Sequence, residues 1–178
     1  MKTTSFRDAM ELWNKPERVI LVTCMDSDQI PKVMTVGWKM RTSFQPPMFA
    51  IAISEKRKMH ECLSDSSEFV IAVPGADLAD EVLICGSPDE AENRFERCGF
   101  KTREGLFVKS PIIENCLANF ECKIVHTMQA GDHTIFVGEV LASWANERPT
   151  KNLVIVGENE GYESLAEDEP YKIGVIKG

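Results

Sequence analysis

The sequence predicts a mainly β protein, an antiparallel barrel with helical insertions, and three observations lead to this prediction. Short runs rich in β-branched and aromatic residues recur along the chain. Most of them are joined by polar turns of the hairpin type. The regular alternation of strands and helices that indicates a parallel α/β sheet is absent. Together these features favour strands that pair with their neighbours in sequence, with helices inserted between them.

The first half of the chain is predicted to begin with a helix at residues 5–14, because Phe6, Met10 and Trp13 follow helical spacing. The polar turn at 26–29 should join two strands into a hairpin. The elements expected in this half are strands at 18–25, 32–40, 48–53 and 68–73 and a short helix at 60–63.

Helical insertions are predicted between residues 77 and 99. Asp77 is expected to cap a helix that runs toward Ile84, and residues 87–89 are expected to begin another helix that ends near Gly99. The remaining segments are expected to be an irregular stretch at 100–116, long strands at 117–128 and 133–144 around a Gly-Asp turn, and short extended pieces at 153–156 and 171–176.

Composition and charge limit the class of protein. The chain has 178 residues, 43% of them hydrophobic and 27% charged, and we predict one domain over residues 1–178. The formal net charge of −8, from 28 acidic and 20 basic residues, argues against a nucleic-acid partner. No secretion signal opens the sequence, and no apolar run is long enough to span a bilayer. We therefore expect a cytoplasmic protein with no membrane partner.

Motifs of several common kinds of site are missing. The sequence contains no GxxxxGK[ST] phosphate loop, no GxGxxG dinucleotide turn and no GxSxG nucleophile elbow. The six cysteines form no CxxC pair, so we predict small buried thiols and no metal site. His126 follows the apolar face of its strand and is expected in the core. His133 follows a Gly-Asp turn, where a capping role and a functional role stay equally open.

The strongest candidate for a site spans the second and third predicted strands and the basic segment after them. Thr35 and Gly37 leave room on one strand face, and a glycine inside a strand marks either close approach of a ligand or a bulge. Ser54, Lys56 and Arg57 follow the next strand. A hydroxyl, cations and the N–H groups of a helix beginning near Arg57 could converge there on a phosphate. For the basic triplet of residues 56–58 (KRK) alone, an exposed, solvated run of charges is the better interpretation.

Taken together, these segments resemble the flavin reductase-like family with the FMN-binding split barrel fold, and most closely its flavoredoxin-type branch. The order and spacing of many short segments between Arg18 and Val140 carry the resemblance. They are residues 19–23, 34–38 (MTVGW), 46–47 (PP), 49–53, 57, 60, 68–70, 82–86, 94–95, 120–122, 131–133 (GDH) and 135–140.

The resemblance implies a homodimer with FMN in a groove near the subunit interface. His133 would lie near the open face of the flavin, where a substrate is contacted. Met59 stands where the family typically has threonine, which removes one phosphate hydroxyl, and Lys56 could compensate. The cofactor-binding residues implied are Thr35, Val36, Gly37 and Trp38 beside the isoalloxazine, Thr42 near the ring or ribityl chain, and Ser54, Lys56, Arg57, Met59 and His60 around the phosphate.

The function implied is a flavin reductase that takes hydride from NADH or NADPH, or a flavoredoxin-type electron carrier, with a small-molecule or protein redox partner. The flavin would supply the redox chemistry, while the protein orients it and tunes its potential. Two alternatives stay open. The same barrel could be a non-catalytic binding module, or the flavoprotein could be reduced by a basic protein partner drawn to its acidic surface.

Overall fold

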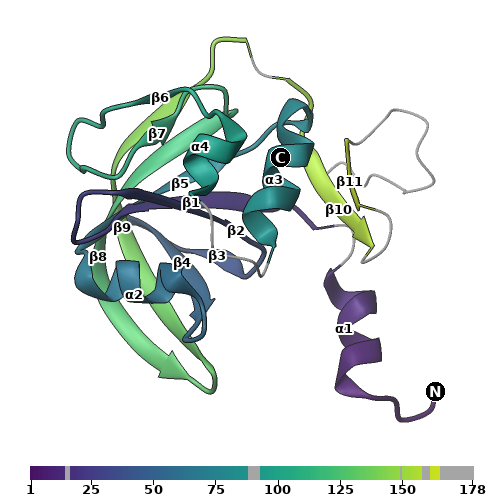
Figure 1. Cartoon of the computed structure of the whole chain (residues 1–178). Coiled ribbons are helices and arrows are strands. Elements are labelled where there is room, and N and C mark those ends of the chain that lie inside the picture. Colours follow the sequence, from purple (N-terminus) through teal and green to yellow (C-terminus); the bar gives the residue numbers. More distant parts are fainter. Residues whose placement is uncertain (15–16, 88–92, 149, 158–160, 165–178) are drawn as a thin grey trace.

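The structure, a computed structural model, describes residues 1–14, 17–87, 93–148, 150–157 and 161–164 (Figure 1). One sheet of seven strands organises it, in the order β2-β1-β5-β8-β9-β4-β3, and all neighbouring strands are antiparallel. These strands are β1 (Ile20–Met25), β2 (Pro31–Val36), β3 (Lys39–Phe44), β4 (Pro47–Ser54), β5 (Glu68–Val73), β8 (Ala118–Ala130) and β9 (His133–Ala145). The prediction of a mainly antiparallel β fold is confirmed.

Helices and two small sheets decorate the main sheet. The helices are α1 (Phe6–Asn14), α2 (Lys58–Asp65), the 3-10 helix η1 (Ala76–Leu78), α3 (Ala79–Gly86) and α4 (Arg94–Cys98). The small sheets pair β6 (Thr102–Arg103) with β7 (Ile112–Ile113), and β10 (Leu153–Gly157) with β11 (Gly161–Ser164). Among the described residues no helix is long and apolar enough to cross a membrane, and no three metal-binding side chains gather into a metal site.

The main sheet curls without closing. Within the described part of the chain, β2 and β3 end the strand order and are not paired with each other. The β8–β9 hairpin is the longest element, and its register shifts at two places, between Glu121 and Cys122 and between Ile124 and His126. Bulges of this kind bend and twist a strand pair. The curled, open sheet is the split form of the predicted barrel.

The predicted strand at 32–40 is wrong in one respect, because the structure divides it. Its first part is β2, which forms the predicted hairpin with β1. The chain leaves that edge at Gly37 and Trp38 and continues as β3, which pairs with β4 at the far end of the sheet. Trp38 at this crossing accepts a backbone hydrogen bond from Ala52 on β4. The alternating pattern continued through the crossing and therefore concealed it.

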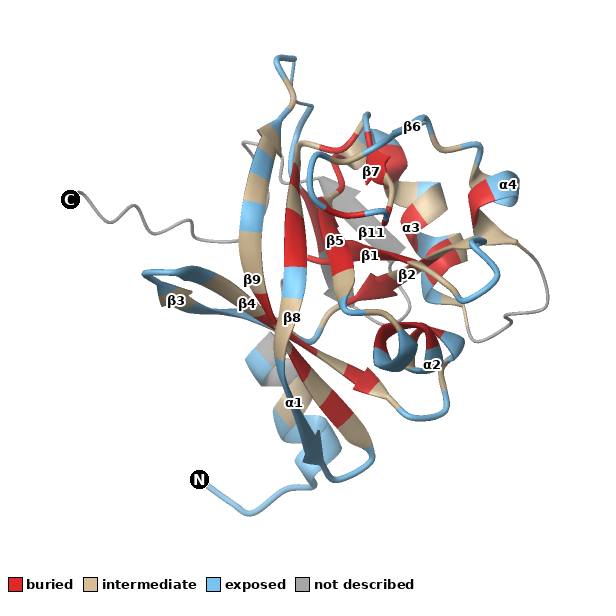
Figure 2. Ribbon diagram, turned by 90° about the vertical axis from the view of Figure 1, so that its left-hand side faces the viewer, coloured by how far each residue is buried: buried red, intermediate tan, exposed pale blue. Residues whose placement is uncertain are grey.

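Two apolar layers hold the fold together, and Figure 2 shows buried residues concentrated in the central strands. One layer fills the concave side of the sheet and includes Ile51, Phe69, Phe136 and residues of α2. The other packs α3 and α4 against the opposite side of β1 and β2. Five of the six cysteines are buried in these layers and the sixth is half-buried, all as free thiols, as predicted.

Several local predictions need correction. Asp77 does not cap a helix, because its carboxylate accepts a hydrogen bond from the Thr150 hydroxyl at 2.6 Å and η1 has no side-chain cap. His126 is exposed instead of buried, because the register shift beside it reverses the face that its side chain occupies. The short strand β11 was not predicted. The extended piece predicted at 171–176 lies outside the described residues.

The helix predicted from residues 87–89 begins later in the structure. Ser87 follows the last turn of α3, and residues 88–92 lie outside the described residues. The helix is α4, whose N-cap Asn93 accepts a hydrogen bond from the Phe95 N–H at 3.1 Å. Its predicted end is confirmed, because Gly99 follows it with φ of +60°, in the left-handed region that glycine adopts without strain.

Candidate functional site

The candidate site is built around the turn between β4 and α2. Ser54 ends β4 and lies opposite His133, the first residue of β9. The chain then turns sharply, so that the Arg57 N–H donates to the Ser54 carbonyl at 3.0 Å. The Ser54 hydroxyl also accepts a hydrogen bond of 3.4 Å from the Lys56 N–H. The turn therefore brings one hydroxyl and two cationic side chains to the rim of the sheet, beside His133.

Helix α2 begins directly after this turn. Arg57 is its N-cap residue, with extended backbone and no side-chain cap. The first turn of a helix has N–H groups without intrahelical acceptors, and the helix dipole favours an anion beside them. Met59 lies in this first turn, but its side chain is buried in the concave core, which it shares with Leu63. Met59 is therefore a core residue whose backbone alone faces the turn.

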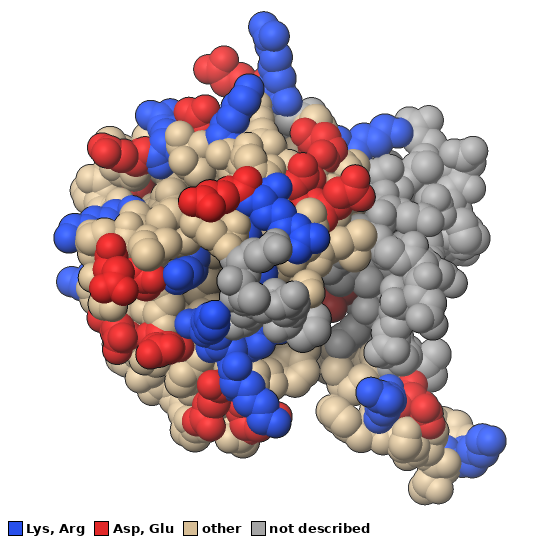
Figure 3. Space-filling view, in the orientation of Figure 1, with Lys and Arg blue, Asp and Glu red and all other residues tan. Residues whose placement is uncertain are grey.

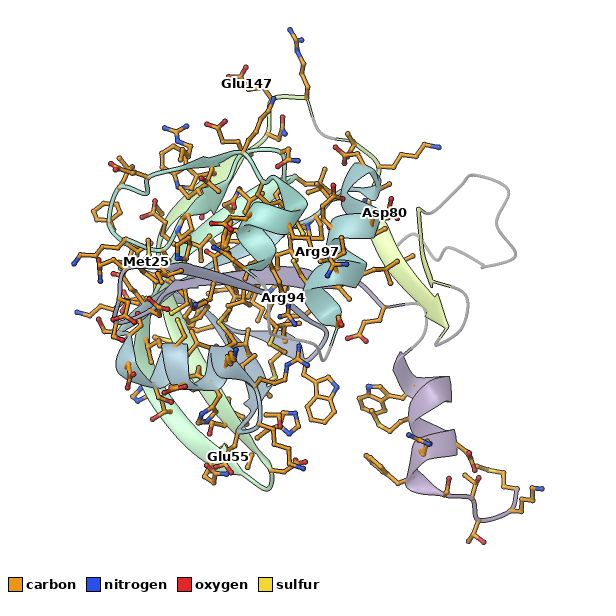
Figure 4. All side chains as sticks on the ribbon, viewed as in Figure 1. Met25, Glu55, Asp80, Arg94, Arg97 and Glu147 are labelled. Atoms are coloured by element: carbon orange, nitrogen blue, oxygen red, sulfur yellow. The ribbon has the colours of Figure 1, made fainter. Side chains whose placement is uncertain are left out.

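A second arginine joins the turn from a distant part of the chain. Arg57 and Arg94 donate from their Nη2 atoms to the same acceptor, the Ser87 carbonyl, at 3.0 and 2.6 Å. Ser87 ends α3 and Arg94 begins α4, and Figure 4 shows Arg94 near the middle of the molecule. Figure 3 shows lysine and arginine side chains gathered in the lower centre of this face. Two guanidinium groups that meet at one point are charged, planar donors of the kind that bind phosphate and carboxylate groups.

His133 is held by two neighbours at this rim. Its ring stacks on the Trp38 ring, with centroids 4.5 Å apart and planes inclined by 24°. Its Nδ1 atom lies 2.7 Å from Asp132 Oδ1, and this contact lowers the pKa of Asp132. A carboxylate can only accept, so Nδ1 carries the proton and Nε2 points elsewhere. The contact with Asp132 and the stack together determine how the imidazole is oriented.

The end of β2 forms another side of the site. The Thr35 hydroxyl is buried and donates to the Val82 carbonyl of α3 at 2.6 Å, so it ties the strand to the helix. Val36 is a core residue. The atoms nearest to a Cβ placed on Gly37 would be those of the Glu17 carboxyl group, at 3.4 Å and beyond, which is ordinary contact distance. Neither packing nor a left-handed backbone therefore requires glycine at this position.

The His60 side chain points away from the turn. Its Nε2 atom lies 2.8 Å from the Thr134 hydroxyl, which itself donates to Gln129 Oε1 at 3.2 Å. Because that hydroxyl has only one proton to give, His60 Nε2 is the donor in the first contact. His60 also meets Phe136 edge-on, with ring centroids 5.6 Å apart. Its side chain thus joins α2 to β9, and only its backbone lies in the first turn of the helix.

The structure does not bring Thr42 to this cluster. Thr42 is exposed at the register shift of β3, beside Phe49 at the other end of β4. Ser54 lies five residue steps along the strand from Phe49, a span of about 17 Å. Two cations near the predicted ring are also engaged elsewhere. Lys39 contacts the Glu17 carboxylate and backbone carbonyls, and Arg41 stacks over Phe44 at 4.4 Å.

Sequence reasoning missed Arg94 as a site residue. It was identified only as part of the Arg94-Phe95 segment that carries the family resemblance. The sequence nevertheless contained an indication of its role. Arg94 directly precedes Phe95 at the start of a helix, and burial of the Phe95 ring holds the neighbouring arginine close to the protein body. The sequence could not show that Arg94 shares its acceptor with Arg57, because Ser87 lies 30 residues from Arg57 in the chain.

The protein is an open antiparallel barrel, and its rim carries paired arginines, a hydroxyl and a stacked tryptophan–histidine pair. These features are typical of a barrel that binds a small ligand with an anionic group and an aromatic group. Comparison with known proteins identifies the family. A model of the flavin reductase like domain matches residues 14–165, so the chain belongs to the flavin reductase-like family.

Two relatives illustrate the range of similarity. An uncharacterized protein of Archaeoglobus fulgidus is 40% identical over 112 residues, which are 62% of this chain and 63% of that protein. The match therefore spans somewhat less than two thirds of that relative. The FMN reductase (NADH) SmoA of Agrobacterium fabrum is 31% identical over 138 residues, covering 77% of this chain and 74% of the relative.

A solved structure agrees with the fold. The NADH:FAD oxidoreductase SgcE6 of Streptomyces globisporus superposes with a TM-score of 0.79 at 24% identity. The superposition covers 95% of this chain and 99% of that one. At this identity the likeness establishes the fold alone, and it confirms the split-barrel architecture that the family resemblance implies.

Proposed function

We propose that the chain binds FMN at the β4–α2 turn and acts as a nicotinamide-dependent flavin reductase or as a flavoredoxin-type electron carrier. One observation carries this proposal: Arg57 and Arg94 converge on the Ser87 carbonyl, and the turn that carries Arg57 begins at Ser54, which pairs with His133 of the Trp38–His133 stack. A compact anion joined to a flat ring would use both features. Family membership supports a flavin, and the arrangement of side chains supports this placement of its phosphate and its ring.

The residues present fit a phosphate monoester. The Arg57 and Arg94 guanidinium groups offer planar, charged donors, and Ser54 offers a hydroxyl. Backbone N–H groups in the first turn of α2 add further donors with a favourable dipole. Met59 removes no donor from this set, because its side chain packs in the core and its N–H stays in that turn. Arg94 adds a second guanidinium group to this set, from a segment that itself belongs to the family resemblance.

The flavin ring is assigned to the surface beside Gly37 and Trp38. Gly37 has no structural need to be glycine, which favours close approach of a ring to its backbone. A flavin held there would supply the hydride and electron transfer, while these residues would bind and orient it. The protein holds His133 with Nδ1 protonated toward Asp132, so that Nε2 can contact a nicotinamide or an acceptor beside the flavin. His133 is the residue we assign to the substrate side, and Thr35 and Val36 support the ring from the core.

We further propose a homodimer located in the cytoplasm, with either NADH or NADPH as donor. In a dimer, exposed Thr42 on β3 would serve the site of the partner subunit, since it lies far from Ser54 of its own chain. The acceptor is a small molecule or a protein. If the chain is an electron carrier and not a nicotinamide-dependent reductase, its net charge of −8 favours a basic protein as the electron donor.

The decisive experiment is a titration of the purified protein with FMN, followed by absorbance and by flavin fluorescence. We expect Arg57→Ala to raise the Kd for FMN about 10- to 100-fold, because a charge-assisted contact of about 1.5–3 kcal/mol is lost. Arg103→Ala is the matched control, since Arg103 stacks on Trp144 at 4.5 Å in a different region. An unchanged Kd in Arg57→Ala would remove that residue from the site.

Reduction separates the proposed functions. Bleaching of the bound flavin by NADH or NADPH supports a reductase. Bleaching only by a reduced ferredoxin-like protein supports the carrier. A purified protein that takes up no added FMN would contradict both and leave the alternative of a split-barrel module for another ligand.

A further inference from the structure

We propose that Cys85 and Cys98 form a reversible disulfide that couples the thiol redox state of the protein to the flavin site. The two Sγ atoms, from α3 and α4, are 3.9 Å apart. A disulfide requires about 2.05 Å, so the sulfurs must approach by roughly 2 Å. Cys85 is fully buried and Cys98 is half-buried. The pair thus has one thiol that an external reagent can reach and one thiol positioned to resolve the product.

The position of this pair on α3 connects it to the candidate site. Three residues before Cys85, the Val82 carbonyl accepts the Thr35 hydroxyl from β2, beside the surface assigned to the ring. Two residues after Cys85, the Ser87 carbonyl accepts both arginines of the phosphate cluster. Helix α3 therefore touches both halves of the proposed flavin site, and Cys85 lies between the two contacts.

Helix α4 carries the other half of the connection. Arg94 is its first residue and Cys98 its last, one turn away. A covalent bond between Cys85 and Cys98 would join the helix that offers the Ser87 carbonyl to the helix that offers Arg94. Among the described residues, these two helices are joined by packing, by the hydrogen bond from Arg94 to the Ser87 carbonyl and by the weak contact of the thiols. The cross-link would restrict both arginines to the arrangement that a phosphate requires.

The chemistry is thiol–disulfide exchange with a low-molecular-weight disulfide such as oxidised glutathione. The Cys98 thiolate attacks one sulfur of the oxidant, forms a mixed disulfide and releases one thiolate. The Cys85 thiolate then attacks the Cys98 sulfur, forms the internal S–S bond and releases the second thiolate. The two protons lost by the cysteines end on the two released thiols. Burial raises the pKa of both thiols, so the reaction should accelerate as the pH rises above neutrality.

The other cysteines provide a contrast. Cys24 and Cys62 are also neighbours, but both are buried in the concave core, where a reagent has no access. Cys116 is buried in the α3 layer. Exchange should therefore select one pair among the six cysteines, and this selectivity distinguishes a site from general oxidation.

The test begins with the full chain, free of flavin, incubated with oxidised glutathione at pH 8.5, blocked with N-ethylmaleimide and digested for peptide mass spectrometry. We expect a peptide linked through Cys85 and Cys98 that is two hydrogens lighter than its parts and disappears on reduction. Cys98→Ser and Cys98→Ala should abolish it, while Cys116→Ala should retain it. A dominant link between other cysteines, or between two chains, would overturn the proposal.

The second measurement rests on the proposed function and is separable from the first. Reduced and cross-linked proteins are titrated with FMN, and we expect the cross-linked protein to bind about threefold or more tightly, because the arginines are pre-organised. The Cys98→Ser protein should show no difference after the same oxidant treatment. Equal affinity of both forms would overturn the coupling. Failure of the reduced protein to bind FMN would instead count against the proposed function, while the peptide map still decides the disulfide.

Discussion

At the scale of single residues, some residues of the site have partners nearby in the sequence, and others have partners in distant segments. Ser54 and Arg57 meet across three residues of one turn, and the sequence placed both correctly beside the start of a helix. Arg94 reaches the same point only because α3 and α4 fold over β2. No pattern of spacing reports such a contact. Local chemistry was predictable here, and convergence from distant segments was not.

Gly37 offers the sharpest test of where the ring binds. Gly37→Ala should leave the free energy of unfolding within about 0.5 kcal/mol of wild type, because the atoms nearest to the added methyl, those of the Glu17 carboxyl group, lie at ordinary contact distance. The affinity for FMN should nevertheless fall severalfold if a ring lies against this backbone. Urea unfolding and FMN titration of the same preparation measure the two quantities.

Gly138→Ala is the matched control, because its added methyl would come within 2.6 Å of the Phe69 ring and 2.9 Å of Cys122 Cβ. Crowding of this kind costs about 1–3 kcal/mol. The two variants should therefore behave oppositely: one loses flavin affinity at constant stability, and the other loses stability. If Gly37→Ala bound FMN as tightly as wild type, the ring would have to lie elsewhere.

At the scale of elements, the apolar pattern predicted where strands lie in the sequence better than it predicted which strands pair with each other. The strand at 68–73 is observed with the predicted bounds, because a β-branched run between polar residues leaves little choice. The strand at 32–40 was wrong where it crosses from one end of the sheet to the other, since Trp38 and Met40 continue the apolar alternation although both are exposed. Alternation reports which face a residue occupies, and it says nothing about which strand lies beside it.

The segment before β7 depends on one buried carboxylate. Glu121 has no exposed surface and accepts hydrogen bonds from the N–H groups of Leu106, Phe107 and Val108 and from Trp144 Nε1, at 2.7–3.0 Å. Glu121→Ala leaves four donors without their acceptor, among them the buried Val108 N–H, and should cost about 3 kcal/mol or more. Glu104→Ala, an exposed change in the same segment, is the control. Urea unfolding at pH 7 measures both.

The same carboxylate should make stability depend on pH. Burial raises the pKa of Glu121, but the four hydrogen bonds outweigh it, so the pKa in the folded protein lies below the ordinary value of 4.5. Its contribution is therefore complete above that ordinary value and is lost as the pH falls through the lowered folded pKa. Glu121→Gln should flatten this acid limb. An acid limb as steep in Glu121→Gln as in wild type would assign the effect to other carboxylates.

At the scale of the whole molecule, the open sheet leaves an apolar edge. Strand β3 ends the strand order, and it carries Met40 and Phe44 with 59% and 77% of their surface exposed. Trp38, at the entrance to the same strand, is 52% exposed. An uncovered edge strand with large apolar side chains is a surface that proteins normally cover. A second copy of the chain is the occupant that the proposed homodimer supplies.

We therefore expect sedimentation velocity to show a dimer of the wild-type chain and a monomer of the double variant Met40→Ser, Phe44→Ser. The variant removes the apolar surface that drives the association and leaves the core untouched. Leu106→Ser is the matched control, because Leu106 is 69% exposed on the segment held by Glu121, and it should remain a dimer.

The dimer also predicts a consequence for the flavin. If Thr42 on β3 serves the site of the partner subunit, the monomeric variant should bind FMN more weakly than wild type although Arg57, Arg94 and Ser54 are intact. Dilution of the wild-type protein below its dimerisation constant should weaken FMN binding in the same way. A double variant that stays dimeric would move the interface away from β3. A monomer that binds FMN with wild-type affinity would show that one chain holds the complete site, and Thr42 would then have no role in it.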